Sequence, residues 1–426
     1  MSATTTSARA RRVLLLLTFT RWFPVGLTIG VITLIPLERG MSLAQLGVIL
    51  AAQGVVVLAL ELPTGGFADA IGRRPVLLAA TVVALVSSLV FVLAQTFTAF
   101  VVALLLQGVF RALDSGPLEA WYVDAAQADD PDVVVEDGLS RAGTVLGASI
   151  AGGALLSGAL VTWNPVPSVG ALETPYWLSI VFIVVNLLAT SALMREHASH
   201  VDSQGLHRAV RSAREAPRVV VGGLRLLGAN RVLLALVLVE VFWAIGMIAY
   251  ETFLPVRLAE IVGGETRAGA LMGPVSAAAW ALFAVGSSLA AVLSRRVGVA
   301  WTAIASALAR AAFTVVMGLT AGAVGLITAF LLVYTLHGTG GPSHATLLHR
   351  QAETRNRTTV LSMNSMVAGG SFSLGLLALG PLADATSTST GIVVAGALSV
   401  LGAALYWPAL RQERTAPSTE ADTLVG

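Results

Sequence analysis

Twelve long apolar stretches, separated by polar segments, make up most of this chain. A helix of about 20 apolar residues crosses roughly 30 Å of hydrocarbon, and within lipid only helices or closed barrels satisfy their backbone hydrogen bonds. The pattern therefore predicts an all-α membrane protein with twelve transmembrane helices. The expected helices lie near residues 13–37, 43–67, 74–95, 98–122, 139–163, 175–194, 231–256, 268–294, 298–318, 322–347, 358–382 and 389–410.

The composition argues against a soluble protein. Of the 426 residues, 56% are hydrophobic and only 12% are charged, which is more apolar surface than a water-soluble core could bury. The chain contains no cysteine, so neither disulfides nor thiolate metal sites are available to it. We expect no enzymatic activity, no metal and no cofactor.

The arginines are unevenly distributed between the two sides of the expected membrane protein. If the N-terminus lies in the cytoplasm, nearly all arginines of the polar segments fall on the cytoplasmic side of the membrane. The extracellular side would hold only Arg39, Arg257 and Arg267. This positive-inside pattern predicts a multi-pass protein of the cell membrane with both termini in the cytoplasm. It also accounts for the basic residues without nucleic-acid binding.

The longest polar interruption separates the expected helices into two groups of six. We expect a cytoplasmic N-terminal segment at residues 1–12, six-helix bundles at 13–194 and 231–410, a central cytoplasmic loop at 195–230 and a cytoplasmic tail at 411–426.

The two groups of six look like copies of each other. One constant interval relates three positions of the first half, Arg12, Arg21 and Pro36, to Arg231, Glu240 and Pro255 of the second half. Gly116, Pro117 and Glu119 recur in the same way as Gly341, Pro342 and His344. Such repeats predict two pseudo-symmetric bundles with a binding site between them near the middle of the membrane.

A polar cluster, G-G-F-A-D-A-I-G-R-R-P, runs from Gly65 to Pro75 between two apolar stretches. Glycine permits close helix packing at position 65 and a tight turn at position 72, and the aspartate can face a helix N-terminus. In register, the cluster resembles the loop motif G-x-x-x-D-x-x-G-R-[RK] of the major facilitator superfamily, although Ala70 replaces the usual basic residue. The matching residues are Gly65, Asp69, Gly72, Arg73 and Arg74.

The fourth apolar stretch resembles the helix-4 pattern R-x-x-Q-G of the same superfamily, with Leu104 in the arginine position before Gln107. Arg111 lies two turns later on the same face. Arg111 and Asp114 are spaced to form an ion pair, which is either structural or part of a proton-coupled switch. The glycine-rich fifth stretch partly resembles the antiporter motif of the superfamily, but its small residues also favour close packing alone.

The resemblance implies a secondary transporter in which the two bundles rock about a central site. Such a protein takes a small-molecule substrate, uses the proton gradient as its energy source and works within the lipid bilayer. The chain has no lysine and hence no P-loop, so we expect no use of ATP. Twelve helices make a complete carrier, so we expect a monomer.

Ionisable residues within apolar helices are the candidates for substrate and proton binding, because each costs about 2.5–3.5 kcal/mol at the membrane centre unless it is paired or hydrated. Glu240, Met247 and Glu251 share one face of the seventh stretch, with Trp243 and Tyr250 beside them. We expect this face to line a cavity that suits cationic or amphiphilic substrates and to hold a proton. Alternatively, Glu240 is a fixed partner of an arginine in the first helix, Arg21, and Glu251 lies at the outer interface.

Other polar residues are expected to assist. His344, the repeat counterpart of Glu119, is expected to face the cavity and exchange a proton. Arg310 is expected to turn inward and pair, without contacting substrate. Glu119 and Asp124, near the cytoplasmic end of their helix, are expected to form gate or loop contacts. The expected partners are Arg73, Arg74 or Arg141.

Because acidic and aromatic residues share the expected cavity, the sequence favours proton-coupled efflux, by antiport, of hydrophobic or amphiphilic drug-like compounds, as in multidrug efflux. The alternative is a proton-coupled symporter that imports small organic anions. In that case Arg21 and Arg111 form the clamp for the anion.

Overall fold

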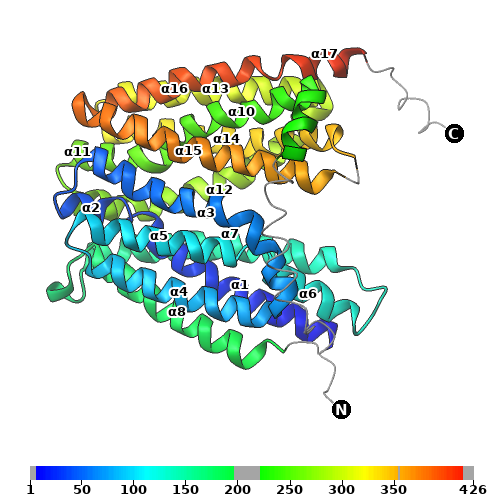
Figure 1. Ribbon diagram of the computed structural model, residues 1–426. Coiled ribbons are helices and arrows are strands. Elements are labelled where there is room, and N and C mark those ends of the chain that lie inside the picture. The colour runs from blue at the N-terminus through cyan, green and yellow to red at the C-terminus, as the bar shows by residue number, and fades with distance from the viewer. Residues whose placement is uncertain (1–5, 196–220, 354–355, 416–426) are drawn as a thin grey trace.

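The computed structural model describes residues 6–195, 221–353 and 356–415, apart from the side chains of residues 61–70 and 358. Within these ranges every regular element is a helix, and twelve helices are long and apolar enough to cross a membrane. Each falls where the sequence predicts one. The helices run roughly parallel, with α2 and α11 at one end of the molecule and α6 and α17 at the other (Figure 1). These ends are called the α2 end and the α17 end.

The first six spans are built from eight α-helices and a short 3₁₀ turn. They are α1 (Ser7–Ile29), α2 (Leu34–Glu38), α3 (Leu43–Ile71), α4 (Arg73–Leu93), α5 (Phe97–Leu113), α6 (Pro117–Gln127), α7 (Val135–Trp163), η1 (Pro167–Val169) and α8 (Glu173–Leu193).

The last six spans follow the same plan. They are α10 (Arg231–Ile248), the π-helical η3 (Ala249–Phe253), α11 (Leu254–Val262), α12 (Glu265–Val297), α13 (Val299–Leu319), α14 (Ala323–Gln351), α15 (Arg357–Ala385), α16 (Thr388–Ala404) and the terminal α17 (Trp407–Thr415). Of the expected central loop, residues 196–220 lie outside the described residues.

The first helix of each half is interrupted at the equivalent place. In the N-terminal half a turn separates α1 from α2, and in the C-terminal half a π-helical segment separates α10 from α11. Pro36 and Pro255, which are repeat counterparts, lie just after these interruptions, since proline lacks the N–H group that a continuous helix needs. The repeated sequence therefore produces a repeated irregularity.

The fourth span departs from the prediction of one continuous helix over residues 98–122. Helix α5 ends at Leu113 and α6 begins at Pro117, because Gly116 adopts φ 92° and proline then starts a new helix. Its counterparts Gly341 and Pro342 lie inside the unbroken α14. The same dipeptide thus breaks a helix in one half and not in the other.

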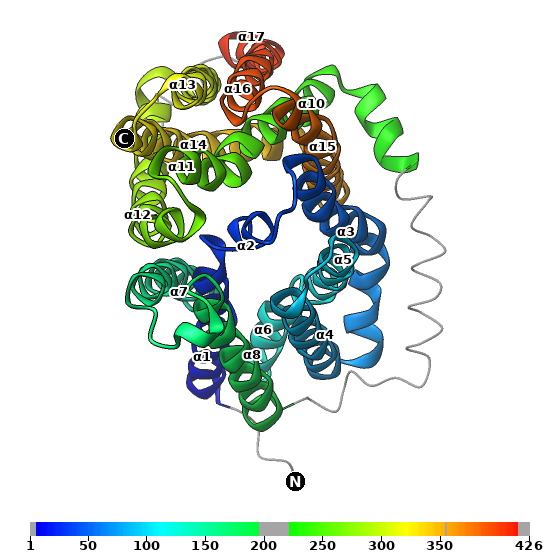
Figure 2. The ribbon, with the colours of Figure 1, turned by 90° about the vertical axis from the view of Figure 1, so that its left-hand side faces the viewer.

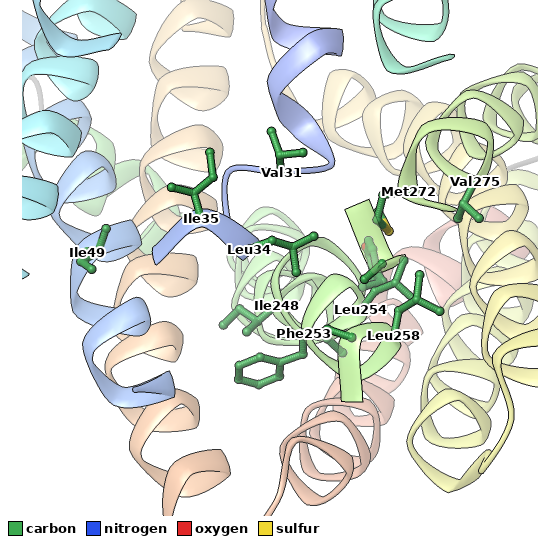
Figure 3. Close-up of a cluster of buried hydrophobic side chains, with 14 of the residues drawn as sticks. Val31, Leu34, Ile35, Ile49, Ile248, Phe253, Leu254, Leu258, Met272 and Val275 are labelled. Carbon is green, nitrogen blue, oxygen red and sulfur yellow. The ribbon is translucent and has the colours of Figure 1, made fainter. Parts of the chain in front are cut away.

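A hydrophobic cluster joins the two halves at the α2 end. It combines residues from the first bundle, such as Leu34 and Ile49, with residues of the second, such as Phe253 and Met272 (Figure 3). Two further clusters lie within single halves, one over residues 10–194 and the other over residues 227–410. In the view from the α2 end, α2 lies between the two groups of helices (Figure 2). Hydrophobic packing therefore closes this end.

Two helix pairs form the seams between the halves, α3 with α15 and α7 with α12 (Figure 2). In the second seam a Cβ added to Gly273 would lie 2.6 Å from the Cα atom of Gly158, and in the first a Cβ on Gly47 would lie 2.6 Å from the carbonyl oxygen of Leu376. Backbones approach this closely only where at least one of the facing residues is glycine or another small residue. In the fifth span, Gly158 thus serves packing between the bundles, whereas Gly153 packs against α1 of its own half.

Candidate substrate cavity and ionic clusters

A cavity lies within the N-terminal half. Its volume is about 210 Å³, and its lining comes from α1, α4, α5 and α8 and from the turn before α6. The lining contains two arginines, several hydroxyl groups, an amide and aromatic rings. These residues include Arg21, Trp22, Thr28, Ser88, Gln107, Phe110, Arg111, Ser115, Tyr176 and Ser179.

Arg111 is exposed where it lines this cavity. It forms no hydrogen bond or ion pair with any residue that the structure describes. The prediction that Arg111 pairs with Asp114 is wrong, because α5 ends at Leu113 and the chain turns before the two side chains can meet along a helix. Among the residues that the structure describes, the Arg111 guanidinium therefore has no direct ion-pair partner in the cavity.

Asp114 instead forms an ion pair with Arg21 of α1, and its own side chain is only 3% exposed. The Arg21 guanidinium also lies over the ring of Trp22, with 4.6 Å between Cζ and the ring centroid. The alternative in which Arg21 pairs with Glu240 is likewise wrong, since Arg21 is held within its own half. One of the two cavity arginines is thus neutralised and the other is not.

Among the remaining polar groups of the cavity, the Gln107 amide offers hydrogen-bond donors, whereas the hydroxyl groups of Thr28 and Ser179 donate to backbone carbonyls of their own helices. Ser87 donates a hydrogen bond to Oε1 of Gln107 over 3.1 Å, which leaves the Gln107 amide N–H groups available. Tyr176 lies in the wall, where its ring stacks on Phe91 at 4.8 Å between centroids. The cavity therefore offers positive charge, hydrogen-bond donors and aromatic surface.

Glu240 lies outside this cavity, in the core of the C-terminal half. Its Oε1 atom accepts a hydrogen bond from Asn364 Nδ2 at 2.9 Å and lies 3.2 Å from His344 Nε2. The other ring nitrogen of His344 lies 3.0 Å from the hydroxyl group of Tyr406. His344 is buried, so it does not face this cavity as the sequence suggested; its contacts with α10 and α15 enclose it.

Trp243, one turn after Glu240, belongs to the same core. Its indole N–H donates to Nδ1 of His337 at 3.2 Å, and the hydroxyl group of Tyr250 lies 3.1 Å from the same nitrogen. The guanidinium of Arg310, from α13, lies 3.8 Å above the Trp243 ring. Met247 packs between two hydrophobic clusters and lines neither cavity. The expected cavity wall on α10 is instead a packed interior, because α13 and α14 cover it.

Glu251 lines a second, much smaller cavity of about 20 Å³ between the two halves. Its Oε1 accepts a hydrogen bond from the hydroxyl group of Tyr334 at 2.6 Å. Trp280, Phe330 and Met272 also line this space. The indole nitrogen of Trp280 is buried and has no hydrogen-bond partner among the described residues. Glu251 thus lies among residues of the hydrophobic cluster of the α2 end, such as Tyr250, Met272 and Phe330.

The loop motif between the second and third spans lies at the α17 end. Gly72 adopts φ 101°, which allows the chain to turn directly from α3 into α4. Arg73 pairs with Asp124 of α6 at 2.9 Å, as the sequence predicted, and Arg74 donates to the carbonyl oxygen of Ser191 at 2.6 Å. These contacts connect α4 to α6 and α8. The side chains of the motif residues Gly65 and Asp69 lie outside the described residues.

Several residues of the two sites have no marker in the sequence. Asn364, Tyr406 and Tyr334 look like ordinary polar positions of apolar helices, and only the fold brings them to a carboxylate. The one signal in the sequence was the presence of a histidine and a glutamate, His344 and Glu240, in two apolar stretches. Recognising them as partners would have required knowing that α10 packs against α14 and α15.

The chain matches the family model described as Major Facilitator Superfamily over residues 14–375. Among solved structures, it is similar to the nucleoside transporter NupG, with a TM-score of 0.74, 11% sequence identity, and coverage of 94% of this chain and 99% of that one. It is also similar to a bacterial homologue of the human drug peptide transporters PepT1 and PepT2, with a TM-score of 0.70, 13% identity, and coverage of 96% and 99%. No curated protein sequence matches it.

The identities to these structures are low, so the likeness concerns the fold. The family model, in contrast, covers most of the chain, including the loop motif, the first half and the greater part of the second half. Twelve membrane-spanning helices in two similar groups agree with it. The chain belongs to the major facilitator superfamily of transporters.

Proposed function

We propose that this protein is a proton-coupled secondary transporter of small organic anions. The observation that carries the proposal is the unpaired guanidinium of Arg111 in a cavity where Arg21 is already neutralised by Asp114. An uncompensated cation within a membrane protein is costly, and an anionic ligand that binds it removes that cost. We therefore propose symport as the mode, because a positively charged cavity suits an anion better than a lipophilic cation.

The size of the cavity supports a small substrate. Drug-sized ligands occupy pockets of about 300–1,000 Å³, whereas this cavity measures about 210 Å³. Trp22, Phe110 and Tyr176 offer apolar and aromatic surface for the body of the solute, and the Gln107 amide offers a donor next to Arg111. A carboxylate or phosphate group on a compact, partly apolar body is the chemistry that these residues recognise.

The packing at the two ends of the molecule fits transport by alternating access. The α2 end is closed by the hydrophobic cluster shared between the halves, while the clusters near the α17 end stay within single halves. We propose that the α17 end faces the cytoplasm, as the arginine distribution favours. The cavity then belongs to a conformation that is closed toward the outside, in a monomer of the cell membrane.

A second candidate is efflux of amphiphilic cations, which one observation favours. Glu251 lies among Tyr250, Trp280, Phe330 and Tyr334, and a carboxylate surrounded by aromatic rings suits a lipophilic cation. The space beside it is about 20 Å³, so a cation would bind there only after the halves separate. This site would become the substrate site in the efflux mode.

The experiment is uptake into proteoliposomes with a panel of labelled probes. The panel contains benzoate, succinate and phenyl phosphate as anions, tetraphenylphosphonium as a lipophilic cation, and uridine and dialanine because similar structures are nucleoside and peptide transporters. We expect saturable uptake of at least one anion. Uptake of the cation alone, abolished by Glu251→Gln, would contradict the proposal and establish the second candidate.

The decisive variant is Arg111→Gln, which removes the charge and keeps a hydrogen-bonding side chain. A hydrogen bond to a charged group contributes about 1.5–3 kcal/mol, so we expect roughly a 10- to 100-fold loss in affinity for the transported anion. The matched control is Arg141→Gln, since Arg141 pairs with Asp137 on the surface of α7. Equal effects of the two variants would contradict a role for Arg111 in the cavity.

A further inference from the structure

Four arginines at the α17 end of the C-terminal half are not used by the proposed substrate cavity. Two of them lie in the last turn of α12, Arg295 and Arg296, and two belong to α17, Arg411 and Arg414. All four are exposed, and their guanidinium groups form no hydrogen bond or ion pair with any residue that the structure describes. These arginines and two tryptophans beside them, Trp301 and Trp407, are called the basic patch.

Helix α17 is held against the turn between α12 and α13. The Glu413 carboxylate accepts hydrogen bonds from the backbone N–H groups of Val299 and Ala300 at 3.1 and 2.9 Å. A Cβ added to Gly298, in the turn itself, would lie 3.2 Å from Oε2 of the same carboxylate. On its inner side α17 buries Leu410 in the hydrophobic cluster of the C-terminal half. The arginines of α12 and α17 therefore share one surface, and the only carboxylate of α17 does not pair with them.

The outward side of α17 combines arginine with tryptophan. Trp407, Arg411 and Arg414 are spaced by four and three residues, which places them on one face of the helix. The Arg411 guanidinium lies over the Trp407 ring, with 5.6 Å between Cζ and the ring centroid. The Arg414 guanidinium lies over the Trp301 ring at the same distance. Trp407 is 46% exposed and Trp301 is 40% exposed. Side chains of these two types are typical of the interface between hydrocarbon and lipid headgroups.

The arginine pair of α12 has a counterpart in the other half that is engaged by the protein. Arg295 is the repeat counterpart of Arg73, which pairs with Asp124 at 2.9 Å. At nearly the same interval, the position that corresponds to Asp124 is His349, in the last turn of α14. A histidine offers no carboxylate, so the described part of the C-terminal half supplies no anion to Arg295. An anion from outside the chain can take that place.

We propose that the basic patch binds the headgroup of an anionic phospholipid. Helix α17 lies on the outer rim of the C-terminal helices, beside α13 and α16 (Figure 2). A phosphate group accepts hydrogen bonds from several guanidinium groups at once, and basic clusters next to membrane spans attract anionic lipids. The acyl chains extend along exposed apolar side chains of α12 such as Leu293 and Val297.

The surroundings of the arginines favour a lipid over a free phosphate ion. Trp301 and Trp407 present exposed ring surface next to the guanidinium groups, and only a lipid has a glycerol backbone and acyl chains to contact it. The lipid site is separate from the substrate cavity and does not depend on the substrate class.

The first test is native mass spectrometry of the purified, delipidated protein in detergent. The probes are phosphatidylglycerol, phosphatidylcholine, whose headgroup has no net charge, and glycerol 3-phosphate as a free phosphate. We expect phosphatidylglycerol to bind at concentrations where phosphatidylcholine does not, and glycerol 3-phosphate at equal concentration to leave it bound. Equal binding of the two lipids would overturn recognition by charge. Displacement by glycerol 3-phosphate would overturn the lipid assignment in favour of a free phosphate.

The decisive variant is Arg411→Gln combined with Arg414→Gln. Each arginine near an anionic lipid surface contributes about a factor of five in affinity, so we expect roughly a 25-fold rise in the Kd of phosphatidylglycerol. The matched control is Arg9→Gln with Arg12→Gln, which removes two exposed arginines of α1 from the N-terminal half. We expect this control to keep the wild-type Kd. Equal losses in the two double variants would show a general effect of charge and overturn the site.

A second test locates the lipid by fluorescence. Phosphatidylglycerol that is brominated near the top of its acyl chains quenches the tryptophans that it contacts. We expect saturable quenching in the wild type, and we expect Trp301→Phe combined with Trp407→Phe to lose it. Trp163→Phe, which removes an exposed tryptophan at the end of α7, should retain it. Saturable quenching that survives in the double variant would place the lipid elsewhere and overturn the proposal. Neither test requires transport, so the results are independent of the proposed substrate.

Discussion

Arg21 forms an ion pair with Asp114, and its repeat counterpart Glu240 pairs with His344. In each half, therefore, a charged side chain of the first span contacts a partner on the fourth span, but that side chain is a guanidinium in one half and a carboxylate in the other. The pair in the N-terminal half lies at the substrate cavity, and the pair in the C-terminal half is enclosed. The duplicated architecture thus supports two different chemical environments.

The Arg21 and Asp114 pair is expected to stabilise the break between α5 and α6. Asp114→Asn leaves the Arg21 guanidinium without its counter-ion, and breaking a buried pair costs about 3–5 kcal/mol; we expect about 3 kcal/mol, since the Arg21 side chain is 20% exposed. The measurement is unfolding of the purified protein by SDS titration. Adding Arg21→Gln to Asp114→Asn should recover part of the loss, and a double variant that is less stable than the single one would disprove the pairing.

The close approach of α7 and α12 predicts a strong effect at Gly158. A Cβ there would lie 2.7 Å from the carbonyl oxygen of Ala270 and 2.9 Å from the Cα of Gly273, both backbone atoms that cannot turn away. We expect Gly158→Ala to cost about 1–3 kcal/mol by overpacking. In the same helix, Gly147 has no atom within 4 Å of its added Cβ, so Gly147→Ala should be neutral or stabilising. Equal unfolding midpoints for the two variants would contradict the described seam.

The repeat-related glycines Gly116 and Gly341 offer a test of backbone conformation alone. Neither has an atom within 4 Å of an added Cβ, but only Gly116 has a positive φ, at 92°. Gly116→Ala should destabilise the protein by about 1–2 kcal/mol because an L-residue is strained there. Gly341→Ala should stabilise it by about 0.5–1 kcal/mol because glycine is unfavourable inside a helix. Opposite signs in the same unfolding assay are the expected result.

Glu413 of α17 caps the start of α13. Its carboxylate accepts hydrogen bonds from the backbone N–H groups of Val299 and Ala300 at 3.1 and 2.9 Å, and it pairs with Arg350 at 3.0 Å. We expect Glu413→Ala to cost about 0.5–2 kcal/mol, as loss of a helix cap does. Hydrogen exchange at the first turn of α13 should become faster. Arg350→Ala, which removes only an exposed ion pair, should leave that exchange nearly unchanged.

Much of the helical framework could be predicted from the sequence, because the length of an apolar stretch is a local property. All twelve spans were expected at the places where the structure has them. The pairing of Arg73 with Asp124 was also expected, since both flank the loops at one end of the bundle. The sequence did not predict that Gly116-Pro117 breaks a helix while Gly341-Pro342 does not. The two dipeptides are identical, and only their tertiary surroundings differ.

The candidate site was predicted only in part. Arg21 and Arg111 do line one cavity, as the organic-anion alternative requires. The face of α10 that carries Glu240 and Trp243 was expected to line a cavity, but α13, α14 and α15 cover it with Arg310, His344 and Asn364. Helical periodicity places residues on one face, and it does not say whether another helix covers that face.

The sequence by itself determined that this chain crosses the membrane twelve times as two related halves, since hydrocarbon thickness and backbone hydrogen bonding leave no other use for such apolar stretches. Only the tertiary structure decided which charges meet. Asp114 binds Arg21 and leaves Arg111 facing the cavity because the chain turns at Gly116 and brings α1 against that turn. Ion pairing depends on distances of a few ångströms between separate helices, and those distances are set by packing and not by the order of residues along the chain.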